Sequence, residues 1–397
     1  MQPRGGPLSQ LRRGHEELVL DLLRRHGPLS RSELGKRCGL SRTTLHDILT
    51  VLLAGGAVVT SAQDTAPRGR GRPAETLTLN PDAGQAIGID FARRAVHVAA
   101  VNFAHEIVGS ASEPHAADLP WEDRVELAER LVGTLTGGAL RLGALNAIGV
   151  GVVGPVGDPG DGAASARRLD GLPGLLRKRF GVPVLVDNNT RLAALAESIW
   201  GAAAGGQDVL YLRLSHGVGG GLVVGGSLHR GMYGLSGEFG HITVDPAGAR
   251  CDCGGTGCLE TVASIRAVLD AYNVAGGRAD DVPALVAALE SGDAVALDLL
   301  RDVGTRIGIV LAALCNAIGP GVIVIGGELT ATGAALIGPV EEALSAHILP
   351  ISRHRVHLRR ATLGEAAGAL GGIALVLHES PLLSRYPATE PDPAEDS

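Results

Sequence analysis

The chain has 397 residues and a formal net charge of −7, and 45% of its residues are hydrophobic. This is enough for about two or three domains with buried cores. No apolar run reaches the roughly 20 residues of a membrane span, and the N-terminal residues lack the apolar stretch of a signal peptide. We therefore expect a cytoplasmic protein that makes no membrane contact and keeps its thiols reduced.

Positive charge is concentrated near the N-terminus. Residues 1–80 contain 12 Lys and Arg against 7 Asp and Glu, and the other residues contain 23 against 35. A basic segment joined to an acidic body suggests that only the N-terminal part contacts nucleic acid.

Three short helices are predicted within this basic segment. The first covers about 14–26, and the second starts with a capping box formed by Ser30 and Glu33. Gly39 ends the second helix and opens the tight turn of a helix-turn-helix. The third helix is capped by Ser41 and carries leucine and isoleucine at helical spacing, which gives it one buried face.

The N-terminal end of the third helix is expected to reach base edges in the major groove of DNA. Two predicted wing strands, 57–60 and 76–79, enclose a loop with three arginines spaced by glycine, which suits phosphates or a narrow minor groove. A plain three-helix domain with a solvated charged face is the alternative. The two elements together favour a winged helix that binds DNA. The candidate DNA contacts are Ser41, Arg42, Thr43, His46, Arg68, Arg70 and Arg72.

From residue 85 onward, apolar strands alternate with helices, which is typical of an α/β architecture with two lobes and a cleft between them. We expect strands at 86–90, 96–101, 147–153, 182–186, 209–214, 221–224 and 322–325. Helices are expected near 121–136, 189–204, 262–272, 283–290, 294–318 and 364–378. The predicted domains are a winged helix at 1–80, a first lobe at 81–200 plus 366–380, a second lobe at 201–365 and a disordered acidic tail at 381–397.

A cysteine-rich loop is the most specific chemical feature of the chain. The segment from His241 to Cys258 contains three of the five cysteines, and thiolates with an imidazole on a glycine-rich loop can hold zinc tetrahedrally. Cys251 and Cys253 are one residue apart, which is too close for an easy mutual disulfide. Buried or incidental cysteines are the alternative. Glu238 lies just before the first ligand, so a metal in this loop would position it.

Polar side chains in several loops suit a ligand with many hydroxyl groups. Asn188 and Asn189 stand between a strand and a helix, and their amides offer both donors and acceptors. Capping the helix is the alternative role for Asn189. Glu238 has glycines on either side, which allow the backbone to approach a ligand closely. Glu260 starts a helix just after the last cysteine and can accept further hydroxyls, although each acid alone would be read as a surface charge.

The chain resembles the ROK family of repressors, open-reading-frame proteins and sugar kinases, which has an actin/hexokinase-like (ribonuclease H-like) fold, over roughly residues 11–380. The motifs that carry the resemblance are Gly-Glu-Phe-Gly-His at 237–241, the cysteine loop at 251–260, Val-Asp-Asn-Asn at 186–189 and glycine-rich segments at 217–221 and 320–327. The resemblance implies a structural zinc ion held by His241, Cys251, Cys253 and Cys258. It also implies sugar contacts from Asn188, Asn189, Glu238, His241, Glu260 and, in a further glycine-rich loop, Gly154.

Two differences between this sequence and the kinases of the family favour a regulator over an enzyme. The kinases carry Asp-Ile-Gly-Gly-Thr where small residues approach ATP phosphates, whereas residues 90–94 read Asp-Phe-Ala-Arg-Arg. Bulky Phe91 and two arginines are therefore expected to replace the open phosphate turn. The catalytic base of the kinases is the aspartate of an Asn-Asp pair, and Asn189 stands at that position as an amide that cannot accept a proton. We expect no kinase activity.

The chain is therefore predicted to be a sugar-responsive, DNA-binding transcriptional regulator of carbohydrate genes, a repressor with a kinase-like sugar sensor. An active ATP-dependent sugar kinase with an appended DNA-binding domain is the alternative, and a DNA-binding scaffold that no longer senses sugar is the third possibility. The expected partners are double-stranded operator DNA and a small sugar effector. A homodimer or a dimer of dimers is expected, because paired recognition helices must meet major grooves ~34 Å apart.

Overall fold

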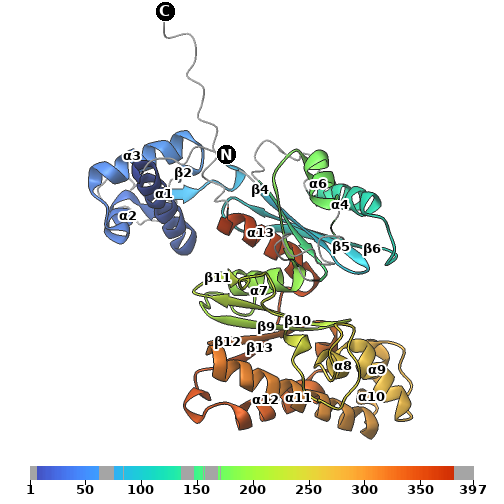
Figure 1. Ribbon diagram of the computed structural model, residues 1–397. Coiled ribbons are helices and arrows are strands. Elements are labelled where there is room, and N and C mark those ends of the chain that lie inside the picture. Colours follow the sequence, from blue (N-terminus) through green and yellow to red (C-terminus); the bar gives the residue numbers. More distant parts are fainter. Residues whose placement is uncertain are drawn as a thin grey trace, which may run out of the picture.

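Three sheets organise the part of the chain that the computed structural model describes, which is residues 7–61, 76–83, 85–135, 147–154, 156, 169 and 171–379, without the side chains of 7–14, 17, 61, 82, 378 and 379. A three-stranded sheet belongs to the N-terminal region, and each of two five-stranded sheets organises one lobe of the body (Figure 1). The predicted α/β fold, with an N-terminal winged helix before a two-lobed body, is therefore confirmed. The predicted domain boundaries stay predictions.

The N-terminal region is a winged helix-turn-helix. Its elements are α1 (Pro7–His26), β1 (Leu29–Ser30), α2 (Arg31–Cys38), α3 (Arg42–Ala54), β2 (Val58–Ser61) and β3 (Thr76–Leu79), with β3 between the other two strands and antiparallel to both. The capping box is present, since Ser30 N donates to the Glu33 carboxylate over 2.8 Å and Glu33 N donates to Ser30 Oγ over 3.2 Å. Gly39 ends α2 with a φ of 64°, and Ser41 Oγ caps α3 by accepting from Thr44 N.

The core of the winged helix continues into the body. Leu20 and Leu49 share one apolar cluster with Phe103 and Ile373 of the first lobe, and Trp200 packs against that cluster. The winged helix is therefore held against the first lobe by buried apolar contacts as well as by the chain connection (Figure 1).

The first lobe is a sheet with helices on both faces. Its strand order is β6-β5-β4-β7-β8, in which β5 is antiparallel to both β4 and β6, and β7 and β8 are parallel to β4. The strands are β4 (Gln85–Phe91), β5 (Ala95–Asn102), β6 (Ile107–Pro114), β7 (Ile148–Val152) and β8 (Val184–Asn188). The helices are α4 (Trp121–Leu135) and α6 (Leu172–Phe180) on one face and α13 (Ala367–Glu379) on the other. A Cβ at Gly149 would lie 1.7 Å from Gly372 O, so glycine is required for α13 to come this close to the sheet.

The second lobe is a sheet of order β11-β10-β9-β12-β13. Its strands are β9 (Val209–Leu214), β10 (Val218–Val224), β11 (Ser227–His229), β12 (Val322–Gly326) and β13 (His357–Arg360). The helices that share its main apolar cluster are α8 (Glu260–Ala263), α9 (Ile265–Val274), α10 (Val282–Glu290), α11 (Ala294–Ile318) and α12 (Ala334–His347).

α7 (Asn189–Ile199) and α13 form the layer between the two large sheets (Figure 1). Glycines allow close packing on both sides of α7. A Cβ at Gly371 of α13 would lie 2.0 Å from Leu192 O, and a Cβ at Gly221 of β10 would lie 2.6 Å from the Ala194 Cβ. α7 therefore contacts both lobes, and its N-terminal end meets the end of β8.

Several element boundaries differ from the predictions. α7 ends at Ile199, not near 204, and the predicted helix at 262–272 is two helices because Ser264 is extended and caps the second one. The elements without a predicted counterpart are β1, β6, β11, β13, α6 and α12. β6 and β13 are largely exposed edge strands, and α12 contains Pro339, so their sequences lack a clear apolar period. Among the described residues, no helix combines the length and apolar character needed to cross a membrane.

Candidate ligand site and metal centre

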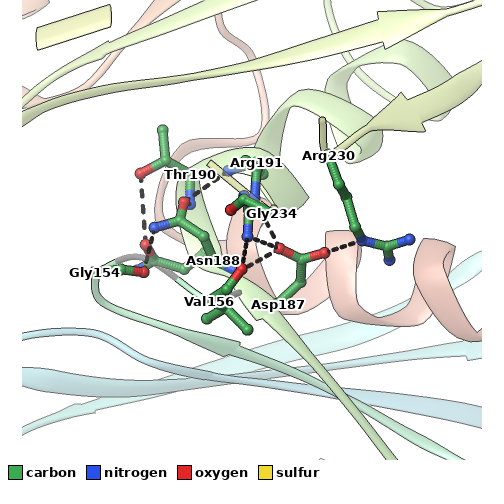
Figure 2. Close-up of polar contacts among 9 residues, drawn as sticks. Gly154, Val156, Asp187, Asn188, Thr190, Arg191, Arg230 and Gly234 are labelled. Carbon is green, nitrogen blue, oxygen red and sulfur yellow. Dashed lines mark hydrogen bonds and ion pairs between the residues drawn. The ribbon is translucent and has the colours of Figure 1, made fainter. Parts of the chain in front are cut away.

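The junction of β8 and α7 brings Asn188 and Gly154 together (Figure 2). Asn188 Oδ1 accepts from Thr190 N at 2.9 Å and from Arg191 N at 3.0 Å, and Asn188 Nδ2 donates to Gly154 O at 2.8 Å. Asn188 is thus the N-cap of α7, and the alternative that Asn189 caps this helix is wrong. Because its carbonyl oxygen already accepts two bonds, Asn188 can offer a ligand the second N–H of its amide.

Asn189 lies in the interior, next to the end of β4. It is 5% exposed, and its Nδ2 donates to Asp90 Oδ1 at 3.0 Å. Burial raises the pKa of Asp90, and the nearby Arg213 and His97, together with the hydrogen bond from Asn189, act in the opposite direction. The hydrogen bond therefore joins the first residue of α7 to Asp90, near the end of β4 and directly before the segment 91–94.

The turn after β4 consists of Ala92, Arg93 and Arg94, and both arginines are exposed. Phe91 is not part of this turn. Its side chain is buried and its ring lies edge-on to Trp121, with the ring centroids 5.5 Å apart. Of the three residues expected to replace the open turn, Phe91 therefore lies outside it, because β4 extends through this residue and its side chain packs in the core.

Glu238, His241 and Glu260 lie near one another in the second lobe. The Glu238 carboxylate is 3.9 Å from His241 Nε2, and Glu260, the first residue of α8, accepts a hydrogen bond from Val218 N at 2.8 Å. Burial raises the pKa of Glu238. The negative charge of Glu260 raises it further, whereas His241 and Arg191 lower it. Two carboxylates beside a glycine-rich strand are well suited to accept hydrogen bonds from hydroxyl groups.

The predicted metal ligands form one cluster. The donor atoms of His241, Cys251, Cys253 and Cys258 all lie within 4.8 Å of one another. His241 Nδ1 is 3.6 Å from Cys251 Sγ, and the sulfurs of Cys253 and Cys258 are 3.7 Å apart. A tetrahedral site with Zn–S bonds of ~2.3 Å requires sulfur–sulfur distances of ~3.8 Å, and a disulfide bond requires ~2.0 Å. The donor types and spacings therefore fit a metal ion.

The two ring nitrogens of His241 point to different neighbours. Nδ1 faces Cys251, and Nε2 faces Glu238. Within the cluster, Gly255 N donates to Cys253 Sγ over 3.4 Å, and this hydrogen bond is the main cause that lowers the pKa of Cys253. The cluster thus has one histidine nitrogen directed at it and the other directed at the candidate ligand site.

The N-terminal end of α3 borders a hollow of about 570 Å³ between α2 and α3. The predicted DNA contacts that lie exposed at this end are Ser41, Arg42, Thr43 and His46. The basic residues that line the hollow are Arg31, Lys36, Arg42 and His46. The predicted contacts that fall outside the described residues are Arg68, Arg70 and Arg72.

Comparison with known proteins identifies the family to which this sequence is related. Residues 86–379 match the sequence profile of the ROK family. The chain belongs to the ROK family.

ROK relatives match the chain to different extents. A putative xylose repressor from a Caldicellulosiruptor species is 28% identical over 384 residues, which cover 91% of this chain and 95% of the repressor. A glucokinase from Halalkalibacterium halodurans is 37% identical over 233 residues, which cover 54% of this chain and 70% of the glucokinase. The crystal structure of a ROK family transcriptional regulator, a homolog of the E. coli MLC protein, is 24% identical and superposes with a TM-score of 0.78 over 95% of this chain and 99% of that one.

Two arginines of this ROK chain lie at the candidate site without having been predicted there. Arg191 and Arg230 both bind the buried Asp187 carboxylate (Figure 2). The spacing of four residues between Asp187 and Arg191 is visible in the sequence, but read as a helical i,i+4 pair it would indicate an exposed ion pair, whereas Asp187 lies in β8 and only Arg191 in α7. Only the fold shows that the Asp187 and Arg191 side chains are each 2% exposed.

Proposed function

We propose that this ROK chain is a sugar-responsive transcriptional repressor whose winged helix binds double-stranded operator DNA. The observation that carries the proposal is the hydrogen bond from Asn189 to Asp90 in a body that is joined to a winged helix. An amide bound to a carboxylate occupies the position where a sugar kinase needs a general base, so the body can bind a sugar without phosphorylating it.

The sugar site that we propose combines groups from both lobes. Glu238 and Glu260 would accept hydrogen bonds from hydroxyls, and His241 Nε2 and the free N–H of the Asn188 amide would donate them. Asn189 and Gly154 complete the proposed contacts. The elevated pKa of Glu238 reflects a carboxylate that loses water to its surroundings, and a bound hydroxyl would compensate for that loss.

Zinc is the metal that we propose for the cluster of three thiols and one imidazole. When bound, zinc would neutralise the thiolates and cross-link the loop from His241 to Cys258. In this site, His241 would position Glu238, because its Nε2 faces the Glu238 carboxylate while its other ring nitrogen faces the cysteines. The metal would be structural, because four protein ligands leave no open coordination position.

The proposed response is a shift between two arrangements of the lobes. Sugar bound between them would favour one arrangement and so change the spacing of two winged helices in a homodimer or a dimer of dimers. The hydrophobic contact between the winged helix and the first lobe supports this coupling, because movement of that lobe carries the winged helix with it.

A thermal-shift screen with d-glucose, d-xylose and N-acetyl-d-glucosamine, followed by DNA binding, tests the proposal. One sugar is expected to raise the melting temperature. DNA duplexes enriched from a random pool are then expected to bind in fluorescence anisotropy, and the same sugar should weaken this binding by about tenfold, as for a coupling free energy of ~1.4 kcal/mol. A chain that binds no duplex at low salt is not a repressor.

A coupled assay of ADP release tests the alternative, an active ATP-dependent sugar kinase, which the partial match to a glucokinase favours. We expect no turnover with any of the three sugars. Turnover that disappears in Asn189→Ala would establish the kinase and contradict the repressor-only assignment.

A further inference from the structure

Arg191, in the first turn of α7, is the largest fully buried side chain among the residues that the structure describes. It is 1% exposed. Its Nε and Nη2 atoms lie 2.8 and 2.6 Å from Asp187 Oδ1, and its guanidinium also donates to Val156 O at 2.8 Å and to Gly234 O (Figure 2). One side chain therefore connects a strand end and two separate loops.

The two carbonyls that Arg191 binds belong to the two sides of the candidate sugar site. Val156 is two residues from Gly154, in the segment that follows β7 of the first lobe. Gly234 lies in the segment between β11 and Glu238 of the second lobe. Arg191 is thus a direct bridge between the two loops that carry predicted sugar contacts.

A second arginine holds the base of the second-lobe loop. Arg230 Nε lies 2.5 Å from Asp187 Oδ2, and Ser236 N donates to Arg230 O at 3.0 Å. Asp187 is thereby paired with two guanidiniums, and its Oδ1 also accepts from Asn188 N at 2.6 Å. Charge-assisted bonds of this kind are strong and directional when buried.

The apolar side chains at the tip of the same loop, residues 232–235, are not buried. Met232 is 88% exposed, Tyr233 56% and Leu235 54%. Apolar packing therefore contributes little to the position of residues 232–235. The hydrogen bond from Arg191 to Gly234 O holds this exposed tip, and the pairing of Arg230 with Asp187 holds the start of the loop. Buried Phe239 fixes the other end, directly after Glu238.

We propose that Arg191 is the positioning residue of the sugar site. It holds the loop that leads to Glu238 against the loop that contains Gly154, so that the two sides of the site are aligned before the sugar binds. This role rests on the proposed sugar sensing. Such alignment lowers the ordering cost of binding and so increases affinity.

Limited proteolysis and sugar binding test this role in the full-length chain. Arg191→Met is expected to speed chymotryptic cleavage at Tyr233 and to raise the Kd for whichever of d-glucose, d-xylose and N-acetyl-d-glucosamine the wild type binds, each by about tenfold. Arg191→Lys keeps one charge but cannot reach all three partners, so it should restore part of both properties. Zinc content should stay at the wild-type level.

Arg179→Met is the matched control. Arg179 also pairs with a carboxylate of the first lobe, Glu129 at 2.5 Å, but on its surface. This variant should match the wild type in cleavage and in sugar affinity. A folded Arg191→Met protein with wild-type cleavage and wild-type affinity would overturn the proposal.

Arg230→Met covers the case in which Arg191→Met does not fold. The Arg230 side chain is 36% exposed, so its loss is tolerated more easily. Cleavage at Tyr233 should again become faster and the Kd for the sugar should again rise, each by less than in Arg191→Met. Unchanged affinity in this folded variant would contradict the role of the Asp187 pairing. A wild-type chain that binds none of the three sugars would contradict the proposed function itself, whereas wild-type binding with unaffected variants contradicts only the role of Arg191.

Discussion

The Asn189 side-chain amide donates a hydrogen bond to the Asp90 carboxylate across 3.0 Å and so joins α7 to β4 in the interior. From Asn189, Asp90 receives a hydrogen-bond donor and not a second negative charge. An aspartate at position 189 would instead place two carboxylates at hydrogen-bonding distance, and two buried carboxylates that close cannot both be ionised. The proposed absence of a kinase base at position 189 and the stability of the interior thus depend on one contact.

Asn189→Asp is expected to lower the free energy of unfolding by about 1–3 kcal/mol at neutral pH, because a donor is replaced by a like charge. Burial already raises the pKa of Asp90, and a second carboxylate raises it further. A raised pKa means that the folded state holds a proton that the unfolded chain releases. Stability is therefore greatest below the unfolded pKa of ~4 and falls as the pH rises through the folded value. Thermal melts should show a larger loss relative to the wild type at pH 8 than at pH 5.

Asn189→Ala is the control for that experiment. It removes the hydrogen bond without adding a charge, so its loss of stability should differ little between the two pH values. Equal losses for Asn189→Asp at pH 5 and pH 8 would show that the two carboxylates do not interact.

Cys253→Ser is expected to remove the metal and to lower the melting temperature and the sugar affinity together. The Cys253 side chain is exposed, so the substitution itself costs little packing. Metal analysis, thermal melting and sugar titration measure the three quantities. Cys38→Ser, at a thiol outside the cluster, should change none of them, and a metal-free wild type with full sugar affinity would separate the metal from sensing.

Arg42→Ala is expected to weaken binding to the selected duplex by ~1–3 kcal/mol if the arginine contacts a guanine, and to relax the preference at that base pair. Arg70→Ala should instead weaken all duplexes alike and reduce the dependence of log K on log salt by about one unit. Anisotropy titrations at several salt concentrations distinguish the two. The same uniform effect from both variants would argue against base reading by α3.

His105 is expected to make stability sensitive to acid. It has a φ of 64° at the turn between β5 and β6, and its carbonyl accepts from Trp200 Nε1 at 2.9 Å. Burial, with Arg24 as a smaller cause, lowers the pKa of His105 to about 3. The stabilisation that a neutral His105 provides is therefore complete above the unfolded pKa of ~6.5 and is lost as the pH falls toward 3.

His105→Asn tests this effect, because asparagine tolerates a positive φ and does not titrate. Denaturant titrations at pH 7.5 and pH 5 should show a wild type that loses up to about 2 kcal/mol more than the variant on acidification. The same pH dependence in both proteins would mean that His105 is not the responsible group.

Features that depend on neighbours in the chain could be predicted from the sequence. Ser30 and Glu33 are three residues apart, and their capping box forms as expected. The candidate metal ligands from His241 to Cys258 span eighteen residues, and they form one cluster. In these cases the interacting groups are close before the chain folds, so spacing and residue type are sufficient.

Features that depend on distant partners could not be predicted. Asn188 and Asn189 offer the same amide at adjacent positions, and only the contact with Asp90, 99 residues earlier, decides which one caps α7. Arg191 has the sequence environment of a solvated helical arginine. It is buried because Val156 and Gly234, 35 and 43 residues away, supply carbonyl partners.

Gly371 and Gly221 flank α7 with backbone rather than side chains. At these two points the distance between α7 and its neighbours is set by the missing side chain. A single methyl group at Gly371 would lie 2.0 Å from the backbone oxygen of Leu192, which cannot rotate away as a side chain can. The layer between the two large sheets would therefore have to widen, so two hydrogen atoms at residues 221 and 371 keep the lobes at their present distance.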